Sequence, residues 1–390
     1  MGYKANLWKM YAINLFLMMH LFAAIIIPFF TEWIGFNFTQ IFLLQAWFMA
    51  SIFFLEIPTG TIADRYGRKA SIALAAFVNA AAALIYANTT NFFVFMFAEF
   101  LWATAFALLS GADQALLYDT LKKIRKQKIA KKVFARYQQA GSIGIILGAP
   151  LGSMIAAATT LRMPVLLSAL PLTVAGLIAL TLAEPLTRRK IETTRYWKIM
   201  KEGIKYFTKH GTLKILAFDM ALVAAITHFI FWFYQPMLTN AGVGIFYFGF
   251  MTVGMNIVAI ALLHYIDQIE KFFGTRKLIF VSTIVPGLCF VAAGLTNFLP
   301  VVIVAPLLIM GFKAIREPIF GHHMNRYIPT PKRATVLSTV SMLRRFIIAA
   351  IYPFIGMLTD WNFSYTLMIL GAVLIAMAFF SKVEESMVKE

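Results

Sequence analysis

Long apolar segments recur along the whole of this 390-residue sequence, and they restrict its possible folds more than any other feature. Each segment is about 19–28 residues long, which lets a helix cross a hydrocarbon core of roughly 30 Å. Strands of about 10 residues with alternating polarity are absent, which argues against a membrane β-barrel. The sequence therefore predicts an all-α polytopic membrane protein with twelve spans, at residues 10–30, 40–60, 70–88, 92–119, 133–158, 164–183, 212–238, 244–266, 277–296, 299–322, 334–358 and 363–381.

The composition excludes a soluble protein. Hydrophobic residues make up 61% of the chain and charged residues 13%, against about 45–50% and about 25% in soluble globular domains. A soluble chain of this length cannot bury so much apolar surface, so lipid must solvate part of it. Cys289 is the only cysteine, which excludes an internal disulfide and a thiolate metal site.

Positive charge indicates how the chain is oriented. The 35 basic residues outnumber the 17 acidic ones, and the formal net charge is +18. With both termini in the cytoplasm, only Arg162 falls in a predicted outer loop and four basic residues fall inside spans, which leaves 30 near the cytoplasmic face. This distribution follows the positive-inside tendency. We therefore expect a multi-pass protein of the cell membrane with cytoplasmic termini, and no nucleic-acid partner is needed to explain the basic runs.

Residues 184–211 form the longest segment that is not predominantly apolar. They fit an amphipathic helix in the inner membrane interface, with lysines away from an apolar side made of Tyr196, Ile199, Met200, Ile204 and Phe207. This linker divides the chain into an N-terminal six-helix bundle over 1–183 and a C-terminal six-helix bundle over 212–390.

The two halves repeat each other at an offset of 203–204 residues. Asp113 corresponds to Glu317, Pro150 to Pro353, and the loop at Asp64 to a looser copy beginning at Asp267. A repeat of this size favours two bundles that move around a shared site near the membrane midplane.

Ionisable residues support the same arrangement. The third, sixth, ninth and twelfth spans carry none in their interiors, so these helices are expected at the periphery. Because charged groups in lipid are costly, those in the other spans are expected to face a polar centre. They are Glu56, Glu99, Asp113, Asp219, Lys313, Arg316, Glu317, Arg344 and Arg345.

The loop between the second and third spans carries the most specific motif. Residues 60–69 read GTIADRYGRK, with Gly60, Asp64, Arg65, Gly67, Arg68 and Lys69 at the fixed positions. This pattern resembles the signature loop of the major facilitator superfamily. The resemblance implies twelve helices in two pseudo-symmetric bundles, alternating access, and an inner gate held by Asp64, Arg65 and Arg68. A cluster that only sets topology is the alternative.

Three further carboxylates are expected near that inner gate. Glu56 precedes the motif on the second span, and Asp113 and Asp119 lie toward the inner end of the fourth. For Asp113 and Asp119, we expect pairing with Arg65 or Arg68 rather than a role in proton coupling.

A glycine pattern in the fifth span bears on the direction of transport. Residues 144–152 read GIILGAPLG, similar to a motif of exporting antiporters of the superfamily, although Ala149 displaces Pro150 by one position. Close helix packing through small residues is the alternative interpretation. Many drug exporters of the superfamily carry an arginine in the middle of the fourth span, whereas this chain has Glu99 there.

Two carboxylates are candidates for proton coupling. Glu99 shares a helical stripe with Trp102, Phe106 and Asp113 if residues 92–119 form one helix. Asp219 in the seventh span is the second candidate. For Glu99, the alternative is a permanent ion pair with a basic residue.

Six residues are candidates for a substrate cavity: His20, Trp102, His228, Trp232, Gln235 and Arg344. The stripe of His228, Trp232 and Gln235 suits an amphipathic solute, although packing in an interfacial aromatic belt would also explain it. His20 could equally be a core histidine. Arg344 or its neighbour is expected to point inward, where it could pair with Glu99 or Asp219 or attract an anionic substrate. Lys313 and Glu317 are spaced to neutralise each other.

The sequence predicts a secondary transporter and not an enzyme. It has no P-loop and no catalytic triad, and the adjacent His322 and His323 lack further ligands at metal spacing, so no metal or other cofactor is expected. A proton gradient is the expected energy source for export of small amphipathic organic compounds by a monomer in the lipid bilayer. The alternatives are a proton symporter that imports a metabolite and a non-transporting receptor or scaffold.

Overall fold

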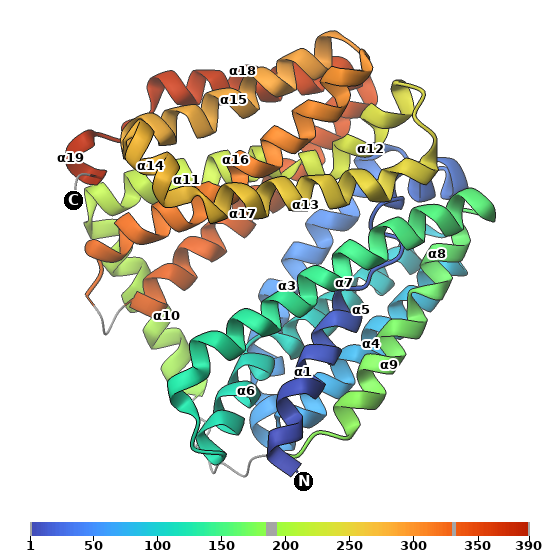
Figure 1. Ribbon diagram of the computed structural model, residues 1–390, viewed down its shortest axis with the longest axis vertical. Coiled ribbons are helices and arrows are strands. Elements are labelled where there is room, and N and C mark those ends of the chain that lie inside the picture. Colours follow the sequence, from blue (N-terminus) through green and yellow to red (C-terminus); the bar gives the residue numbers. More distant parts are fainter. Residues whose placement is uncertain (1, 185–192, 330–332, 389–390) are drawn as a thin grey trace. The chain divides into compact units, whose positions relative to one another are not determined.

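A computed structural model describes residues 2–184, 193–329 and 333–388. Within these ranges, only the backbone is described for residues 56–65, 193–200, 334, 335, 385 and 388. The regular secondary structure of the described chain is all helical, and the described residues contain no strand (Figure 1). The predicted all-α membrane fold is therefore confirmed.

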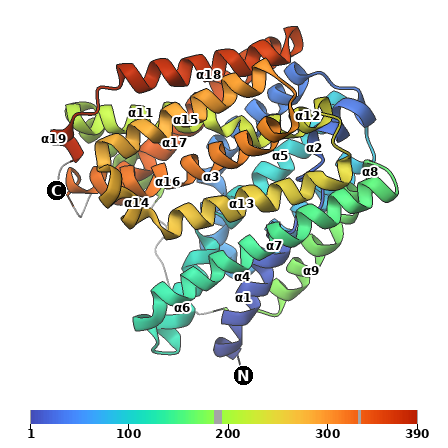
Figure 2. The same ribbon diagram turned by 45° about the horizontal axis from the view of Figure 1, so that its top comes forward.

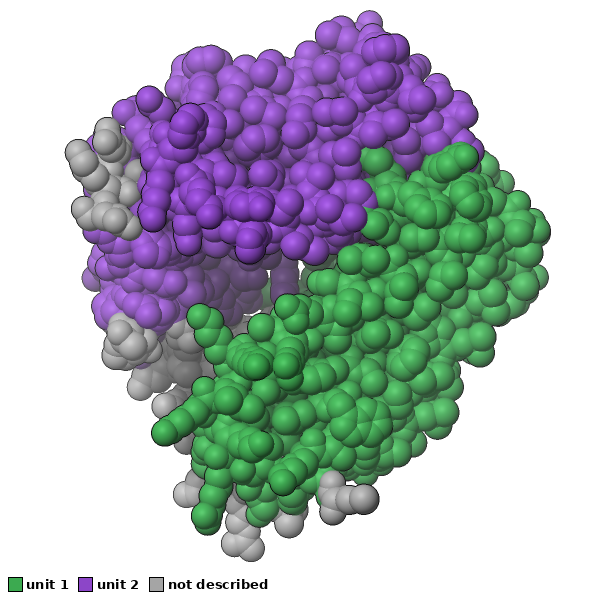
Figure 3. Space-filling view, viewed as in Figure 1, with its two compact units in different colours: residues 1–36, 43–193, 245–253 green, residues 37–42, 194–244, 254–390 purple. Residues whose placement is uncertain are grey.

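The helices gather into two compact units, coloured separately in Figure 3. Unit 1 comprises residues 1–36, 43–193 and 245–253, and unit 2 comprises residues 37–42, 194–244 and 254–390. Helix α3 (Phe38–Tyr66) begins in unit 2 and continues in unit 1, and α13 (Phe248–His264) begins in unit 1 and continues in unit 2.

Unit 1 also contains α1 (Gly2–Met18), α2 (Ile26–Pro28), the π-helix η1 (Phe29–Ile34), α4 (Arg68–Ala87), α5 (Phe92–Leu109), α6 (Ala112–Lys123), η2 (Gln127–Ile129), α7 (Ala130–Ala158), α8 (Arg162–Leu167), α9 (Ala169–Leu180) and η3 (Ile245–Tyr247). Unit 2 contains most of α10 (Thr193–Lys209), then α11 (Gly211–His228), α12 (Ile230–Asn240), α14 (Ile266–Phe273), α15 (Thr275–Leu295), α16 (Leu299–Arg326), α17 (Arg333–Trp361), α18 (Phe363–Phe380) and α19 (Glu385–Val388).

Eleven helices of the described chain are long and apolar enough to cross a membrane, against twelve predicted spans. The difference lies at the first span, predicted as one helix over 10–30. Helix α1 ends at Met18, and the chain turns through residues 19–25 before α2 begins. The first crossing is therefore interrupted.

Other predicted spans are also interrupted. The fourth breaks between α5 and α6, where Gly111 adopts a φ of +76° that other residues rarely take. The seventh breaks at Phe229, directly after His228. Helix α11 thus ends at His228, and α1 ends two residues before His20.

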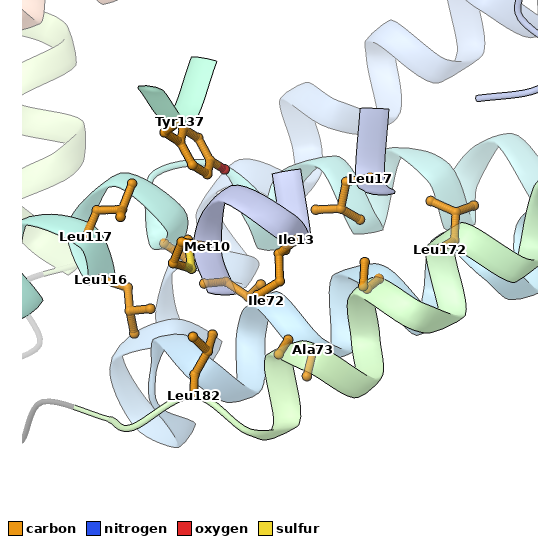
Figure 4. Packing of buried hydrophobic residues seen from close by; sticks show 14 of the residues in the cluster. Met10, Ile13, Leu17, Ile72, Ala73, Leu116, Leu117, Tyr137, Leu172 and Leu182 are labelled. Atoms are coloured by element: carbon orange, nitrogen blue, oxygen red, sulfur yellow. The ribbon is translucent and has the colours of Figure 1, made fainter. Parts of the chain in front are cut away.

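The core of unit 1 forms around α1. Met10, Ile13 and Leu17 of this helix pack against buried side chains of α4, α6, α7 and α9 (Figure 4). The pairs α4 with α9 and, in unit 2, α15 with α18 also lie side by side (Figures 1 and 2). Close approach of α15 and α18 depends on Gly287 and Gly371, because a Cβ on Gly371 would lie 2.5 Å from the Gly287 carbonyl oxygen.

A row of glycines on α7 lets the interrupted first crossing approach its backbone. A Cβ on Gly144 would overlap the carbonyl oxygen of Leu15, and a Cβ on Gly152 would overlap that of Leu21. A Cβ on Gly148 would lie 3.1 Å from the Met19 carbonyl carbon. Packing therefore accounts for the glycine pattern of the fifth span.

Replacing Gly152 with Ala is expected to destabilise the protein, because the new methyl group meets backbone that cannot rotate away. Overpacking of this kind costs about 1–3 kcal/mol. Unfolding of the purified protein in detergent, followed by far-UV circular dichroism, measures the loss. The control is Gly321→Ala in α16, where a Cβ meets nothing within 4 Å. Equal stability of Gly152→Ala and the wild type would contradict the described packing of α1 on α7.

Candidate functional site

Glu99 lies in a buried polar cluster of unit 1. Its side chain on α5 is 3% exposed and accepts hydrogen bonds from Gln45 Nε2 of α3, at 2.8 Å, and from the Tyr86 hydroxyl of α4. Both donors are neutral, and no ion pair to Glu99 occurs within the described part of unit 1. A carboxylate in such a place is costly to bury while it is charged, so gain of a proton changes its energy strongly.

Aromatic rings connect this cluster to the interrupted first crossing. The Trp102 ring stacks on Tyr86 at 5.5 Å between centroids and on His20 at 5.8 Å. The nitrogens His20 Nε2 and Trp102 Nε1 are buried, and neither has a hydrogen-bond partner among the described residues. Because buried polar atoms are normally paired, these two nitrogens mark a place where a solute or water can bind.

Asp113 does not extend the stripe of Glu99 and Trp102. That prediction is wrong because α5 ends at Leu109 and Asp113 lies on the separate helix α6. Its carboxylate accepts hydrogen bonds from the Tyr137 hydroxyl and from the Gln114 backbone N–H, both at 2.7 Å. The expected pairing of Asp113 with Arg68 is therefore absent from the described residues, and pairing with Arg65 stays a prediction because the Arg65 side chain is not described.

The expected pair of Asp119 and Arg68 is present. The two side chains form a buried ion pair between α6 and α4. Gly67 adopts a φ of +92° before α4, as the motif requires of a tight turn. The side chains of Glu56, Gly60, Asp64 and Arg65 lie outside the described residues, so their predicted roles in the inner gate stay predictions.

The start of α4 has a carboxylate that the sequence did not reveal as a cap. Glu184 accepts hydrogen bonds from the backbone N–H groups of Arg68, at 3.1 Å, and Lys69, at 2.7 Å. A negative charge at a helix N-terminus is favourable because unpaired N–H groups and the helix dipole converge there.

Unit 2 has a histidine and a carboxylate near the place that Asp119 and Arg68 take in unit 1. An offset of 204 residues places His323 of α16 where Asp119 stands in unit 1. The His323 Nε2 atom lies 3.7 Å from Glu270 Oε1 of α14, and Glu270 also accepts a hydrogen bond from Thr275. The histidine is thus on the span α16 and the carboxylate on the short helix α14.

Asp219 forms part of a buried network in unit 2. It pairs with Arg316 of α16 and accepts a hydrogen bond from Ser381 Oγ at 2.7 Å. Arg316 also donates to Ser282 Oγ at 2.9 Å and to Thr283 Oγ1 at 2.6 Å. This arrangement has the form of a structural ion pair.

Three of the predicted cavity residues are hydrogen-bonded to tyrosine hydroxyl groups. The Tyr352 hydroxyl lies 2.9 Å from His228 Nε2 and accepts a hydrogen bond from Trp232 Nε1 at 3.3 Å. Gln235 donates to Tyr234 at 3.3 Å. Tyr352 is fully buried, so this group is a packed polar cluster within unit 2.

Within unit 2, Arg344 lies near Glu317 instead of Asp219, and its pairing with Glu99 of unit 1 stays a prediction. Arg344 Nη1 is 3.5 Å from Glu317 Oε1, and the side chains are 30% and 69% exposed. Lys313, expected to neutralise Glu317, forms no ion pair with a described residue. Among the described residues, no group of three or more His, Cys, Asp or Glu could hold a metal ion.

The residues that the sequence did not identify are mostly tyrosines. Tyr86, Tyr137 and Tyr352 bind Glu99, Asp113 and His228 respectively. Asp360 of α17 was also missed. It accepts hydrogen bonds from the backbone N–H groups of Phe38, at 2.7 Å, and Thr39, at 2.9 Å, and so caps α3.

Known proteins resemble this chain in sequence family and in fold. The family model described as the Major Facilitator Superfamily matches residues 7–351. No curated protein matches the sequence. The structure is similar to that of the nucleoside transporter NupG, with 16% identity, a TM-score of 0.79 and 100% of both chains covered.

Two other solved structures share the fold at similarly low identity. One is a POT family transporter in complex with 5-aminolevulinic acid, with 14% identity, a TM-score of 0.75, and coverage of 99% of this chain and 97% of that one. The other is a D-xylose-proton symporter, with 12% identity, a TM-score of 0.72, and coverage of 98% and 99%. At these identities the likeness shows the fold alone.

Replacing Asp119 with Asn is expected to destabilise the protein by about 3–5 kcal/mol, because it leaves the buried Arg68 guanidinium without this carboxylate. Unfolding in detergent measures the effect. The double variant Arg68→Leu with Asp119→Leu should recover most of the loss, since it removes both charges. Lys122→Gln on the exposed side of α6 is the control. A single variant as stable as this control would show that the pair does not hold α4 to α6.

Proposed function

Because the chain belongs to the Major Facilitator Superfamily, we propose that it is a proton-coupled secondary transporter that exports small amphipathic organic compounds by alternating access. Family membership and eleven apolar helices in the described chain identify a multi-pass membrane transporter rather than an enzyme. The coupling ion, the direction and the compound class are the proposed part.

The burial of Glu99 among neutral hydrogen-bond donors carries the proposal. Its carboxylate has Tyr86 and Gln45 as partners and no cation within the described part of unit 1. Gain of a proton removes a charge that nothing in this cluster neutralises. Asp219, the second candidate, has Arg316 and Ser381 as partners, so its charge is already balanced.

The contacts of Glu99 offer a route from proton binding to a change of shape. Both donors bind the same oxygen, Oε1, so protonation of the carboxyl group alters the bond to Tyr86. Tyr86 stacks on Trp102, and Trp102 stacks on His20 at the interruption after α1. A segment without regular helical hydrogen bonds is easier to rearrange than a continuous helix, so the state of Glu99 can bias it.

In the proposed cycle, Glu99 takes up a proton from the outer side and releases it to the cytoplasm, where the next compound binds. The buried nitrogens of His20 and Trp102 provide polar contacts for that compound. The basic loops support cytoplasmic termini in the cell membrane, with Asp64, Arg65 and Arg68 at the inner gate. The bundles over 1–183 and 212–390 move about the linker 184–211 in a monomer.

The glycine pattern over 144–152 is the observation that supports export. Close packing against α1 explains the same glycines, so they do not decide the direction of transport. Import together with protons is therefore the second candidate. It is favoured by the likeness to a D-xylose-proton symporter, and the same buried carboxylate would serve it.

Glu99→Gln is expected to abolish proton-driven accumulation and to leave exchange of solute without a gradient intact, because glutamine keeps the shape but cannot titrate. A pH difference of one unit supplies about 1.4 kcal/mol per proton, or about a tenfold concentration ratio. Flux of a panel of amphipathic solutes into and out of proteoliposomes, with an imposed pH gradient, measures both quantities. Glu202→Gln on α10, which removes an exposed carboxylate, is the control.

The outcome of this assay distinguishes an exporter, a symporter and a non-transporting protein. Solute movement opposite to the proton flux supports export, and movement with it supports the symporter. No flux for any member of the panel would favour a receptor or scaffold. Proton-driven accumulation by Glu99→Gln at the wild-type level would reject Glu99 as the coupling site.

A further inference from the structure

A surplus of positive charge lies in the middle of two membrane-spanning helices of unit 2. Lys313 and Glu317 are one turn apart on α16, and Arg344 is on α17. Glu317 lies beside Arg344, with 3.5 Å between Oε1 and Nη1. Lys313 has no ion pair or hydrogen bond to a described residue, and Glu317 attracts it only electrostatically, so two basic groups share one carboxylate.

The other ionisable groups nearby do not remove this surplus. Arg316 is matched by Asp219, and His228 is bound through Nε2 to the Tyr352 hydroxyl. Lys313 and Arg344 interact electrostatically with each other and with His228, and Glu317 attracts Lys313, so the four groups share one neighbourhood. A histidine can add positive charge there and cannot cancel it.

The exposure of the side chains indicates that water reaches this neighbourhood. Glu317 is 69% exposed and Arg344 is 30% exposed, although both lie in the interior of spans. Charged side chains at that depth do not face hydrocarbon, because the cost is several kcal/mol, and they face aqueous paths instead. The surplus charge therefore lies beside a path that a solute can follow.

The internal repeat shows that the fold does not require these basic residues. At an offset of 204 residues Lys313 corresponds to Leu109, and at the offset of 203 that pairs Pro353 with Pro150, Arg344 corresponds to Gly141. Glu317 corresponds to Asp113, which Tyr137 holds by a hydrogen bond. Unit 1 thus keeps the helices and an acid at this place without a basic residue.

We propose that Lys313 and Arg344 bind the anionic group of the transported compound, a carboxylate or a phosphate. The assignment rests on the proposed transport function and specifies its substrate class as organic anions. The planar guanidinium of Arg344 offers two parallel donors that match either group, and the Lys313 ammonium supplies the second charge. Glu317 positions Arg344 through their ion pair on the exposed side.

Binding to the purified full-length protein in detergent tests the proposal without any proton gradient. The probes share one apolar body and differ in the polar group: 4-phenylbutyrate, 4-phenylbutyl phosphate, the neutral 4-phenylbutyramide and 4-phenylbutanol, and the cationic 4-phenylbutylamine. The midpoint of thermal unfolding is measured against probe concentration. We expect saturable stabilisation by one or both anions and none by the other three, and the two anions show which group is preferred.

Variants locate the binding. Lys313→Gln and Arg344→Gln should each raise the half-saturating concentration of the anion by about tenfold or more, since a hydrogen bond to a charged group contributes about 1.5–3 kcal/mol. Lys313→Arg and Arg344→Lys should retain part of the affinity. Lys205→Gln on α10, which removes an exposed lysine charge, should bind as the wild type does.

Stability without a probe gives a second readout that loss of folding cannot imitate. Lys313→Met should unfold at a higher temperature than the wild type, because it removes a charge that has no ion pair or hydrogen bond to a described residue. A lower unfolding temperature would show that Lys313 has a structural partner, and the proposal would fail.

The failures of the two proposals are distinguishable. Stabilisation by the neutral or cationic probes equal to that by the anions, no stabilisation by either anion, or unchanged anion binding in Lys313→Gln and Arg344→Gln would each reject the anion site. Loss of proton coupling with intact anion binding would bear on Glu99 alone.

Discussion

Polar groups inside the bilayer must find their partners within the protein, because hydrocarbon offers none. The interruption after α1 is the place where this requirement is hardest to meet, since residues 19–25 lack regular helical hydrogen bonds. Turn bonds join Met19 N to the Phe16 carbonyl, Ala23 N to that of His20 and Ile25 N to that of Phe22, and Ser168 Oγ accepts from Leu21 N. These bonds are kept away from lipid because the glycine row of α7 admits the interrupted backbone to close contact.

The same requirement separates the ionisable groups into two kinds. Asp119, Asp219 and Arg316 have buried partners of opposite charge, and such pairs hold helices together. Within the described part of unit 1, Glu99 has only neutral donors, and Lys313 has no ion pair or hydrogen bond to a described residue. Burying an ionisable group without an oppositely charged partner is costly, so such groups are kept where they bind a ligand or a proton. Glu99 and Lys313 therefore indicate function more clearly than the ion-paired residues do.

The sequence predicted the spans, the glycine turn before α4 and the pair of Arg68 with Asp119, because each leaves a local signal in hydropathy, charge or a fixed motif. It did not predict the breaks at residues 19–25, at Gly111 and at Phe229, because an apolar run reads the same whether its helix is continuous or broken. Tyr86, Tyr137 and Tyr352 were missed for a related reason. In a membrane sequence a tyrosine is usually interpreted as an interfacial aromatic residue. A hydrogen bond from its hydroxyl cannot be predicted until the partner on another helix is known.

The division of charge between the units has consequences for energy coupling. If Glu99 carries a proton in unit 1 and Lys313 with Arg344 holds an organic anion in unit 2, each unit binds the ligand that neutralises its own unbalanced group. Exchange of an inward proton for an outward anion then moves two charges in the same electrical sense. An inside-negative potential contributes about 2.3 kcal/mol per charge per 100 mV to such a cycle. Entry of the same anion together with one proton would be electroneutral and gain nothing from the potential. An anionic substrate therefore strengthens the physical case for export, which the glycine pattern alone supports weakly.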